Sequence, residues 1–196
     1  AGFHIEGHIK IFDPETKEVY IDKRNAIHYE NMSVALAASL ANQGYGIIEG
    51  MSFGNGGTDV SPTGVITYRT PNYTGANADL YNPTYGSAAN NLKVINQNFS
   101  NNLDPINNNL SVNHLVGKAY TDIVISCLLN YGEPSGQQVF DNTTDFNDTY
   151  VFDELGLKSA GGKLLTHVIF HPVQKSLNRL IQIDYTVRIQ TLTNLS

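Results

Sequence analysis

The chain has 196 residues, a mass of 21.5 kDa and a formal charge of −6 at pH 7. Hydrophobic residues make up 41% and charged residues only 15%, which excludes disorder driven by high net charge. The length predicts a single domain with a sizeable core. An acidic chain repels phosphate backbones, and its twelve Lys and Arg are scattered, so we expect no direct contact with nucleic acid.

The single cysteine, Cys127, bears on the compartment in which the protein folds. One cysteine excludes an internal disulfide framework and a zinc site built on several thiolates. Residues 1–6 contain neither a basic region nor a long apolar run, and no stretch approaches the roughly 18 apolar residues of a membrane helix. We therefore expect no signal peptide and no membrane span, and folding in a reducing cytoplasm.

The first third of the chain predicts a hairpin and a helix. Isoleucines of one parity in residues 4–12, a polar loop at 13–16 and an apolar segment at 19–21 are typical of a β-hairpin. Apolar side chains then recur every four residues among strong helix formers. This spacing predicts one α-helix over about residues 26–43.

A glycine-rich segment follows the next predicted strand, residues 47–53. It consists of Gly54, Asn55, Gly56 and Gly57, positions that tolerate a positive φ. It lacks the Lys of a phosphate-binding loop, and no helix is predicted after it. The segment therefore predicts a sharp structural turn.

Two polar stretches interrupt the pattern of strands. Residues 71–113 contain 13 of the 22 Asn and little periodicity, and residues 133–150 are a second polar stretch. Both exceed the length of an ordinary connection. We expect two long Asn-rich loops that reach neighbouring molecules.

The second half of the chain predicts three further strands. Residues 119–129 are apolar on both parities, which favours a strand covered on both faces, and residues 163–171 form a strand halted by Pro172. The last segment alternates strictly, and its expected core face consists of Ile181, Ile183, Tyr185, Val187 and Ile189. Strands outnumber helices without alternating with them, so we expect one mainly β domain over residues 1–196: an antiparallel β-sandwich, jelly-roll or Ig-like, with one helix.

The six histidines and one acidic loop are the candidates for metal binding. His4 with His8, and His167 with His171, are spaced four apart on predicted strands, where that spacing separates side chains by about 13 Å. Residues 141–148 begin like an EF-hand loop but lack its Gly and its final Glu. We expect no metal and no cofactor, while Ca²⁺ at residues 141–148 stays an alternative.

No catalytic motif is visible in the sequence. Cys127 lies in an apolar strand without an adjacent cation, so its thiol is expected to be buried and unreactive. Asp153 and Glu154 are neighbours with nothing to divide the roles of acid and base. We therefore expect no catalytic residues.

Tyrosines in the first polar stretch indicate carbohydrate binding as an alternative function. The chain has eleven Tyr and no Trp, and Tyr-rich loops suit contacts between subunits or a sugar-binding surface. Tyr73, Tyr81 and Tyr85 would be the stacking platforms of a carbohydrate-binding module. The absence of Trp weighs against that alternative.

The order of segments resembles virion structural proteins of tailed bacteriophages. The resemblance lies in KRNAIHYENMS at residues 23–33 before an Ala-rich helix, in residues 47–58, and in residues 164–176 with the terminal strand. It implies a part of the virion, made in the host cytoplasm, and implies no catalytic or cofactor residue.

Our leading hypothesis is a noncatalytic structural protein that forms a homo-oligomer at the neck, collar or tail and docks onto other virion proteins. The alternatives are a head decoration protein, and a receptor-recognition module of a fibre that binds a host glycan.

Overall fold

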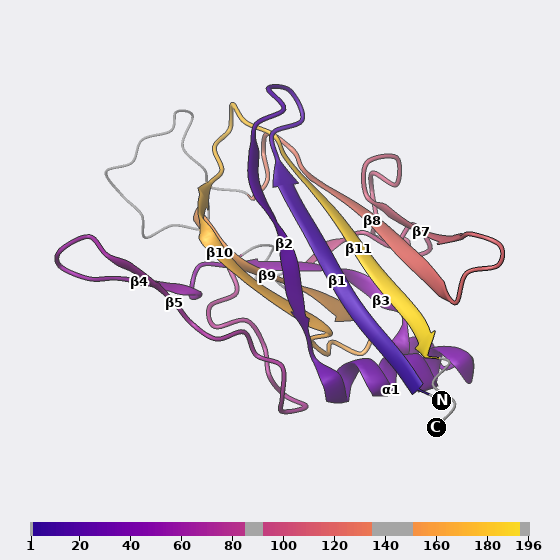
Figure 1. Ribbon diagram of the computed structural model, residues 1–196. Helices are drawn as coiled ribbons and strands as arrows, with labels where there is room; N and C mark the ends of the chain where they lie inside the picture. The colour runs from indigo at the N-terminus through magenta and orange to yellow at the C-terminus, as the bar shows by residue number, and fades with distance from the viewer. Residues whose placement is uncertain (1, 85–91, 135–150, 193–196) are drawn as a thin grey trace.

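The structure is a computed structural model that describes residues 2–84, 92–134 and 151–192. It is mainly β, with one large curled sheet, a separate projecting hairpin and one α-helix across one end of the sheet (Figure 1). The elements in chain order are β1 (Gly2–Phe12), β2 (Val19–Ile27), α1 (Tyr29–Leu40), the 3-10 helix η1 (Gly44–Gly46), β3 (Ile48–Gly54), β4 (Thr58–Val60), β5 (Ile66–Tyr68), β6 (Leu92–Val94), β7 (Asn109–His114), β8 (Tyr120–Leu129), β9 (Val151–Ser159), β10 (Thr166–Gln174) and β11 (Ile181–Leu192).

The large sheet is antiparallel, with the strand order β6-β3-β9-β10-β2-β1-β11-β8-β7. Its two halves are joined by β10 and β2, which pair only at Thr166 with Ile27 and at His167 with Ala26. The sheet curls at this short junction, and buried residues of both halves form one core. The expected two-sheet β-sandwich is thus not confirmed, because the nine strands belong to one sheet.

The outer face of β1, β2, β11 and β8 is polar. Arg188 on β11 donates to Asp122 on β8, with an Nε–Oδ1 distance of 2.8 Å. His8 on β1 contacts Asp22 on β2. A second sheet on this face would have to desolvate these ion pairs, and the core cluster lies on the concave side.

The terminal strand β11 supplies much of this core. Ile181, Ile183, Tyr185 and Val187 are buried, whereas Ile189 is partly exposed. The C-terminal end of β11, from Ile189 onwards, therefore extends out of the buried core and lies beside α1.

The predicted hairpin and helix are present in the structure. β1 and β2 pair in register from Gly7 opposite Asn25 to Ile11 opposite Ile21, and the register shifts by one residue before Phe12, which pairs with Val19. Helix α1 lies inside the predicted range 26–43 and begins after His28, whose Nδ1 accepts the backbone N–H of Asn31 at 3.1 Å. This bond satisfies one of the free donors at the helix N-terminus.

Two strand predictions were wrong in detail. β10 does not stop at Pro172 but continues to Gln174, because its register with β9 shifts between Ile169 and Val173, and such an irregularity accommodates a proline without a ladder donor. β8 is only half-covered on its outer face. It lies second from the sheet edge, where no layer packs on that side.

The two polar stretches are only partly described. Residues 71–113 include β6 and β7, so this stretch is not one continuous loop. Residues 85–91 and 135–150 lie outside the described residues, and with them Tyr85, the candidate Ca²⁺ loop at 141–148 and nearly all of the stretch 133–150. Within the described residues, no helix has the length and apolar character needed to cross a membrane.

Candidate functional site

Two consecutive acidic residues lie on β9 at the point where its register with β10 shifts. Asp153 and Glu154 are both buried, although neither belongs to the apolar core cluster. The flanking residues Phe152 and Leu155 do belong to it. The irregularity thus turns two consecutive carboxylates away from the core and towards the loops that cross β9.

Glu154 accepts four hydrogen bonds from three segments of the chain. Its Oε2 accepts the backbone N–H groups of Gly56 at 2.8 Å and Asn82 at 2.9 Å. Its Oε1 accepts the backbone N–H of Tyr81 at 2.8 Å and Nε2–H of His167 at 2.8 Å. One carboxylate therefore joins the glycine-rich segment, residues 81–82 and strand β10.

The backbone fixes the tautomer of His167. The N–H of Asn72 donates to His167 Nδ1 at 2.7 Å, so Nδ1 is the unprotonated nitrogen. The proton then sits on Nε2 and is donated to Glu154. His167 is a neutral bridge between two loops, with both ring nitrogens in use.

Asp153 holds the other side of the glycine-rich segment. It accepts the backbone N–H groups of Gly57 at 2.8 Å and Thr58 at 2.9 Å, together with the Thr58 hydroxyl at 2.6 Å. We call Asp153, Glu154 and His167 the acid clamp. Thr58 begins β4, so the clamp fixes the point at which the projecting hairpin leaves the body.

Burial and hydrogen bonding act in opposite directions on the two carboxyls. Burial by itself raises the pKa of Glu154, but the donors from His167 and three backbone N–H groups outweigh it and leave the pKa below its ordinary value. Burial dominates for Asp153 and raises its pKa, although its three hydrogen bonds oppose the shift. Glu154 is the carboxylate that the fold holds charged.

The glycines of the turn are required by space rather than by dihedral angle. None of Gly54, Gly56 and Gly57 has a positive φ, contrary to the expectation for this turn. A Cβ on Gly56 would lie 2.7 Å from Tyr81 Cβ and 2.8 Å from Asn82 N, and one on Gly54 would lie 2.5 Å from Asn82 O. At Gly54 and Gly56 the backbone lies so close to residues 81–82 that a side chain would require the segment to move.

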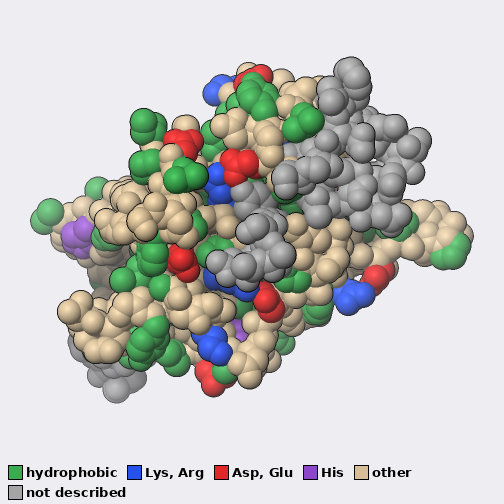
Figure 2. Space-filling model, turned by 180° about the vertical axis from the view of Figure 1, so that it is seen from behind, with side chains coloured by type: hydrophobic (Ala, Val, Ile, Leu, Met, Phe, Trp, Pro, Cys, Tyr) green, Lys and Arg blue, Asp and Glu red, His purple; other side chains and the backbone are tan. Residues whose placement is uncertain are grey.

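The hairpin β4–β5 projects from the body beyond this clamp, and we call residues 58–68 the arm (Figure 1). Its root is fixed by Arg69 N–H, which donates to Gly57 O at 2.9 Å, and by a 3.4 Å contact between the Tyr68 hydroxyl and His171 Nδ1. In Figure 2 the arm extends to the right, with hydrophobic side chains at its outer end. Most of the arm thus has solvent on both sides.

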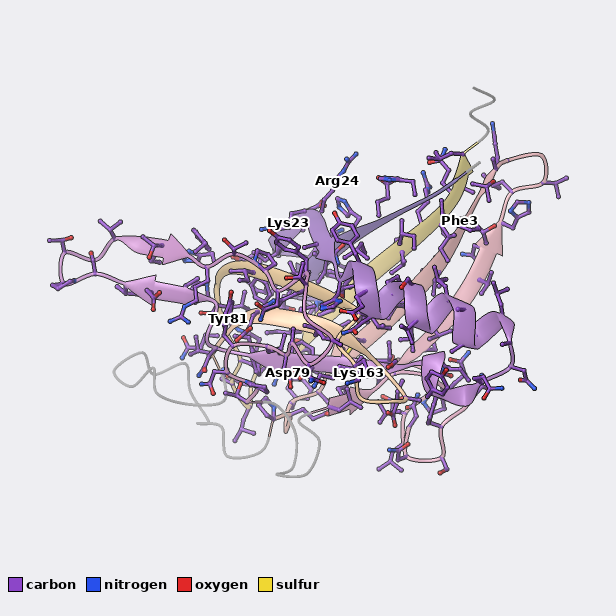
Figure 3. All side chains as sticks on the ribbon, turned by 90° about the horizontal axis from the view of Figure 1, so that it is seen from below. Phe3, Lys23, Arg24, Asp79, Tyr81 and Lys163 are labelled. Carbon is purple, nitrogen blue, oxygen red and sulfur yellow. The ribbon has the colours of Figure 1, made fainter. Side chains whose placement is uncertain are left out.

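An apolar groove lies on the other side of the molecule, between α1 and the concave face of the sheet. It has a volume of about 170 Å³. Leu36 of α1, Val112 of β7, Ile123 of β8 and Ile189 of β11 line it. A larger hollow of about 480 Å³ continues from it past Phe3 (Figure 3). The core is therefore incompletely closed beside α1.

Comparisons of the chain with protein-family models, with curated proteins and with solved structures each gave no match. The clamp, the arm and the groove are therefore the features that bear on a function.

The acid clamp resembles a catalytic Glu–His pair in composition but not in access. Glu154 and His167 are fully buried, and every acceptor or donor position described above is taken by protein. A general base needs to reach a substrate proton. The arrangement is suited to holding loops together.

The sequence analysis missed this cluster. It contains Asp153 and Glu154, which were noted only as neighbours, and His167, which was considered only as a metal ligand. The available signal was the position of two consecutive acids within an otherwise apolar strand, because buried carboxylates require several donors.

The candidate metal ligands are not brought together. His4 and His8 lie on the outer face of β1, where His4 contacts Glu6 and His8 contacts Asp22. Within residues 2–84, 92–134 and 151–192, no three His, Cys, Asp or Glu side chains are grouped as a metal site would require.

The candidate stacking tyrosines differ in their availability. Tyr81 packs against His167 with ring centroids 5.5 Å apart, and the guanidinium of Arg69 lies 5.1 Å from its centroid. Its hydroxyl donates to Thr70 O. Tyr73 is exposed and meets Tyr29 edge-on at 6.4 Å. Tyr81 is exposed to nearly the same degree as Tyr73, but its ring and hydroxyl already contact three groups of the protein.

The thiol of Cys127 is expected to be inert in the folded protein. Cys127 is fully buried, and burial raises the pKa of its thiol to about 12. We expect no modification by an aromatic disulfide reagent at pH 8, measured by absorbance, and one thiol per chain after unfolding in urea. Native-state reaction at the rate of free cysteine would contradict this expectation.

Proposed function

We propose that this chain is a noncatalytic structural subunit of a tailed-bacteriophage particle, which assembles as a homo-oligomer at the neck, collar or tail. The observation that carries the proposal is a contrast between two kinds of surface. The carboxylates and the imidazole of the acid clamp are buried and hydrogen-bonded within the protein, whereas apolar side chains are exposed on the arm and in the groove beside α1. Such a distribution favours binding over catalysis.

Exposed apolar residues occur on many elements, and some of them lie on the arm and at the rim of the groove. Val60 and Val65 belong to the arm, and Val112 lies at the edge strand β7 beside the groove. The low content of charged residues, 15% of the chain, also favours binding, because few charged side chains would have to be desolvated in a contact. Covering by neighbouring copies accounts for these surfaces.

The phage assignment rests on the local sequence resemblance, and the fold is compatible with it. A rigid curled sheet would supply the body, while the arm would reach neighbouring subunits. A head decoration protein, the alternative to a neck, collar or tail protein, would use the same contacts between copies of the chain.

The mass of the purified protein in solution tests the assembly proposal. We expect light scattering after size exclusion, at micromolar and higher concentrations, to give a discrete multiple of 21.5 kDa. Negative-stain images of that fraction should then show rings or stacked rings. A monomer at every concentration would contradict a self-assembling subunit.

A further inference from the structure

The arm is amphipathic. Its register places Val60 opposite Ile66, and Thr58 opposite Tyr68, on one face, while Asp59 lies opposite Thr67 on the other. Val60, on the apolar face, is 64% exposed. Val65 pairs with Ser61 beside the turn, on the face of Asp59. A two-stranded hairpin alone in water is marginally stable. Packing of the apolar face against another surface would therefore stabilise the arm.

The groove beside α1 matches this face in size and polarity. Its volume of about 170 Å³ is comparable to the roughly 150 Å³ cavity that accommodates a benzene molecule, which is enough for one or two aliphatic side chains. Val112, at the rim, is 68% exposed. The described residues that line the groove include no Asp, Glu, Lys, Arg or His.

Charge favours the same pairing. The two charged side chains of the arm region, Asp59 and Arg69, form an ion pair with each other at 3.3 Å. Docking the apolar face of the arm into an uncharged groove would leave no charge buried without a partner. Copies that each carry −6 repel one another, so contact between them costs least at uncharged surfaces.

The arm and the groove lie on opposite sides of the molecule, as Figures 1 and 3 both show. An arm therefore points away from the groove of its own chain. We infer that the arm of one copy docks into the groove beside α1 of the next copy, head to tail. The inference rests on the proposed self-assembly and specifies its contact. A head-to-tail contact uses two different surfaces and produces a ring when the rotation closes.

Disulfide trapping tests this contact. The variants Val60→Cys, on the apolar face of the arm, and Val112→Cys, in the groove, are prepared separately, mixed and oxidised, and the products are separated on a non-reducing gel. We expect a cross-linked dimer from the mixture and little from either variant alone, since arm meets groove but neither meets its like. Cys127 is buried and does not interfere. The matched control mixes Val60→Cys with Val19→Cys, an exposed position at the start of β2.

A second pair of variants tests the contact without cross-linking. Val60→Asp in the arm and Val112→Asp in the groove each place a charge on one of the two exposed surfaces. Each variant alone should be monomeric by light scattering, and an equimolar mixture should give a dimer, because one intact arm and one intact groove remain. Circular dichroism verifies that both variants fold.

The outcomes distinguish failure of the arm-to-groove contact from failure of the proposed self-assembly. A wild-type oligomer that both Asp variants preserve, with no cross-link between Val60→Cys and Val112→Cys, would overturn the arm-to-groove contact and leave self-assembly standing. A monomeric wild-type protein would overturn both. A dimer from the mixed Asp variants supports the contact directly.

Discussion

Replacing Glu154 with Gln is expected to lower the free energy of unfolding by about 3 kcal/mol, on the scale of breaking a buried charged network. Glu154 accepts three backbone N–H groups and Nε2–H of His167. An amide offers one oxygen, and its NH₂ group would face donors where the carboxylate offered an acceptor. Urea denaturation followed by circular dichroism measures the change.

The matched control for this substitution is Glu18→Gln, at an exposed position in the loop between β1 and β2. It removes the same charge without a buried network, so we expect a change within about 0.5 kcal/mol. Equal stability of Glu154→Gln and the wild type would show that the clamp contributes nothing to the fold.

The effect of Glu154→Gln should also depend on pH. Because the folded-state pKa of Glu154 is lowered, its contribution to stability is complete above the unfolded pKa of about 4.3 and is lost as the pH falls through the folded value. Asp153, with a raised pKa, contributes in the opposite sense: stability is present below about pH 3.9 and lost as the pH rises through its folded value. The difference between wild type and Glu154→Gln is therefore expected to narrow on acidification.

Gly56→Ala is expected to destabilise the protein by about 1–3 kcal/mol, the usual cost of overpacking a close contact. The added Cβ would lie 2.7 Å from Tyr81 Cβ and 2.8 Å from Asn82 N. The segment would have to move away from residues 81–82, which lengthens the hydrogen bond from Gly56 N–H to Glu154. Thermal and urea unfolding measure the loss.

Gly44→Ala provides the comparison, because a Cβ there has no neighbour within 4 Å and the residue has no positive φ. Alanine at such a position restricts the unfolded chain, so we expect unchanged or slightly higher stability. A Gly56→Ala protein as stable as Gly44→Ala would show that the turn tolerates a side chain and that the close packing is not required.

These two substitutions also bear on assembly, because the acid clamp and the glycine-rich segment fix the root of the arm. Asp153 binds Thr58, the first residue of β4, and Gly57 O accepts from Arg69, which follows β5. A loosened root lets the arm sample many directions and raises the entropic cost of docking.

Local sequence patterns are sufficient to predict several elements of the fold. Strict alternation from Ile181 to Ile189 specifies the strand β11 and its buried face, because side chains of a strand alternate between its faces. The four-residue spacing within 26–43 specifies α1 for the same kind of reason. A polar loop between two apolar runs specifies the β1–β2 hairpin.

The arrangement of the strands in the sheet and the roles of the buried polar residues depend on contacts between distant segments. Nine strands form one curled sheet instead of a sandwich, because the pairing of β2 with β10, 139 residues apart at Ile27 and Thr166, leaves no trace in local periodicity. Glu154, His167 and Gly56 belong to one cluster only because strands β9 and β10 and the segment after β3 meet there. Hydrogen bonding between distant segments and steric exclusion act through space, and the order of residues does not encode either one locally.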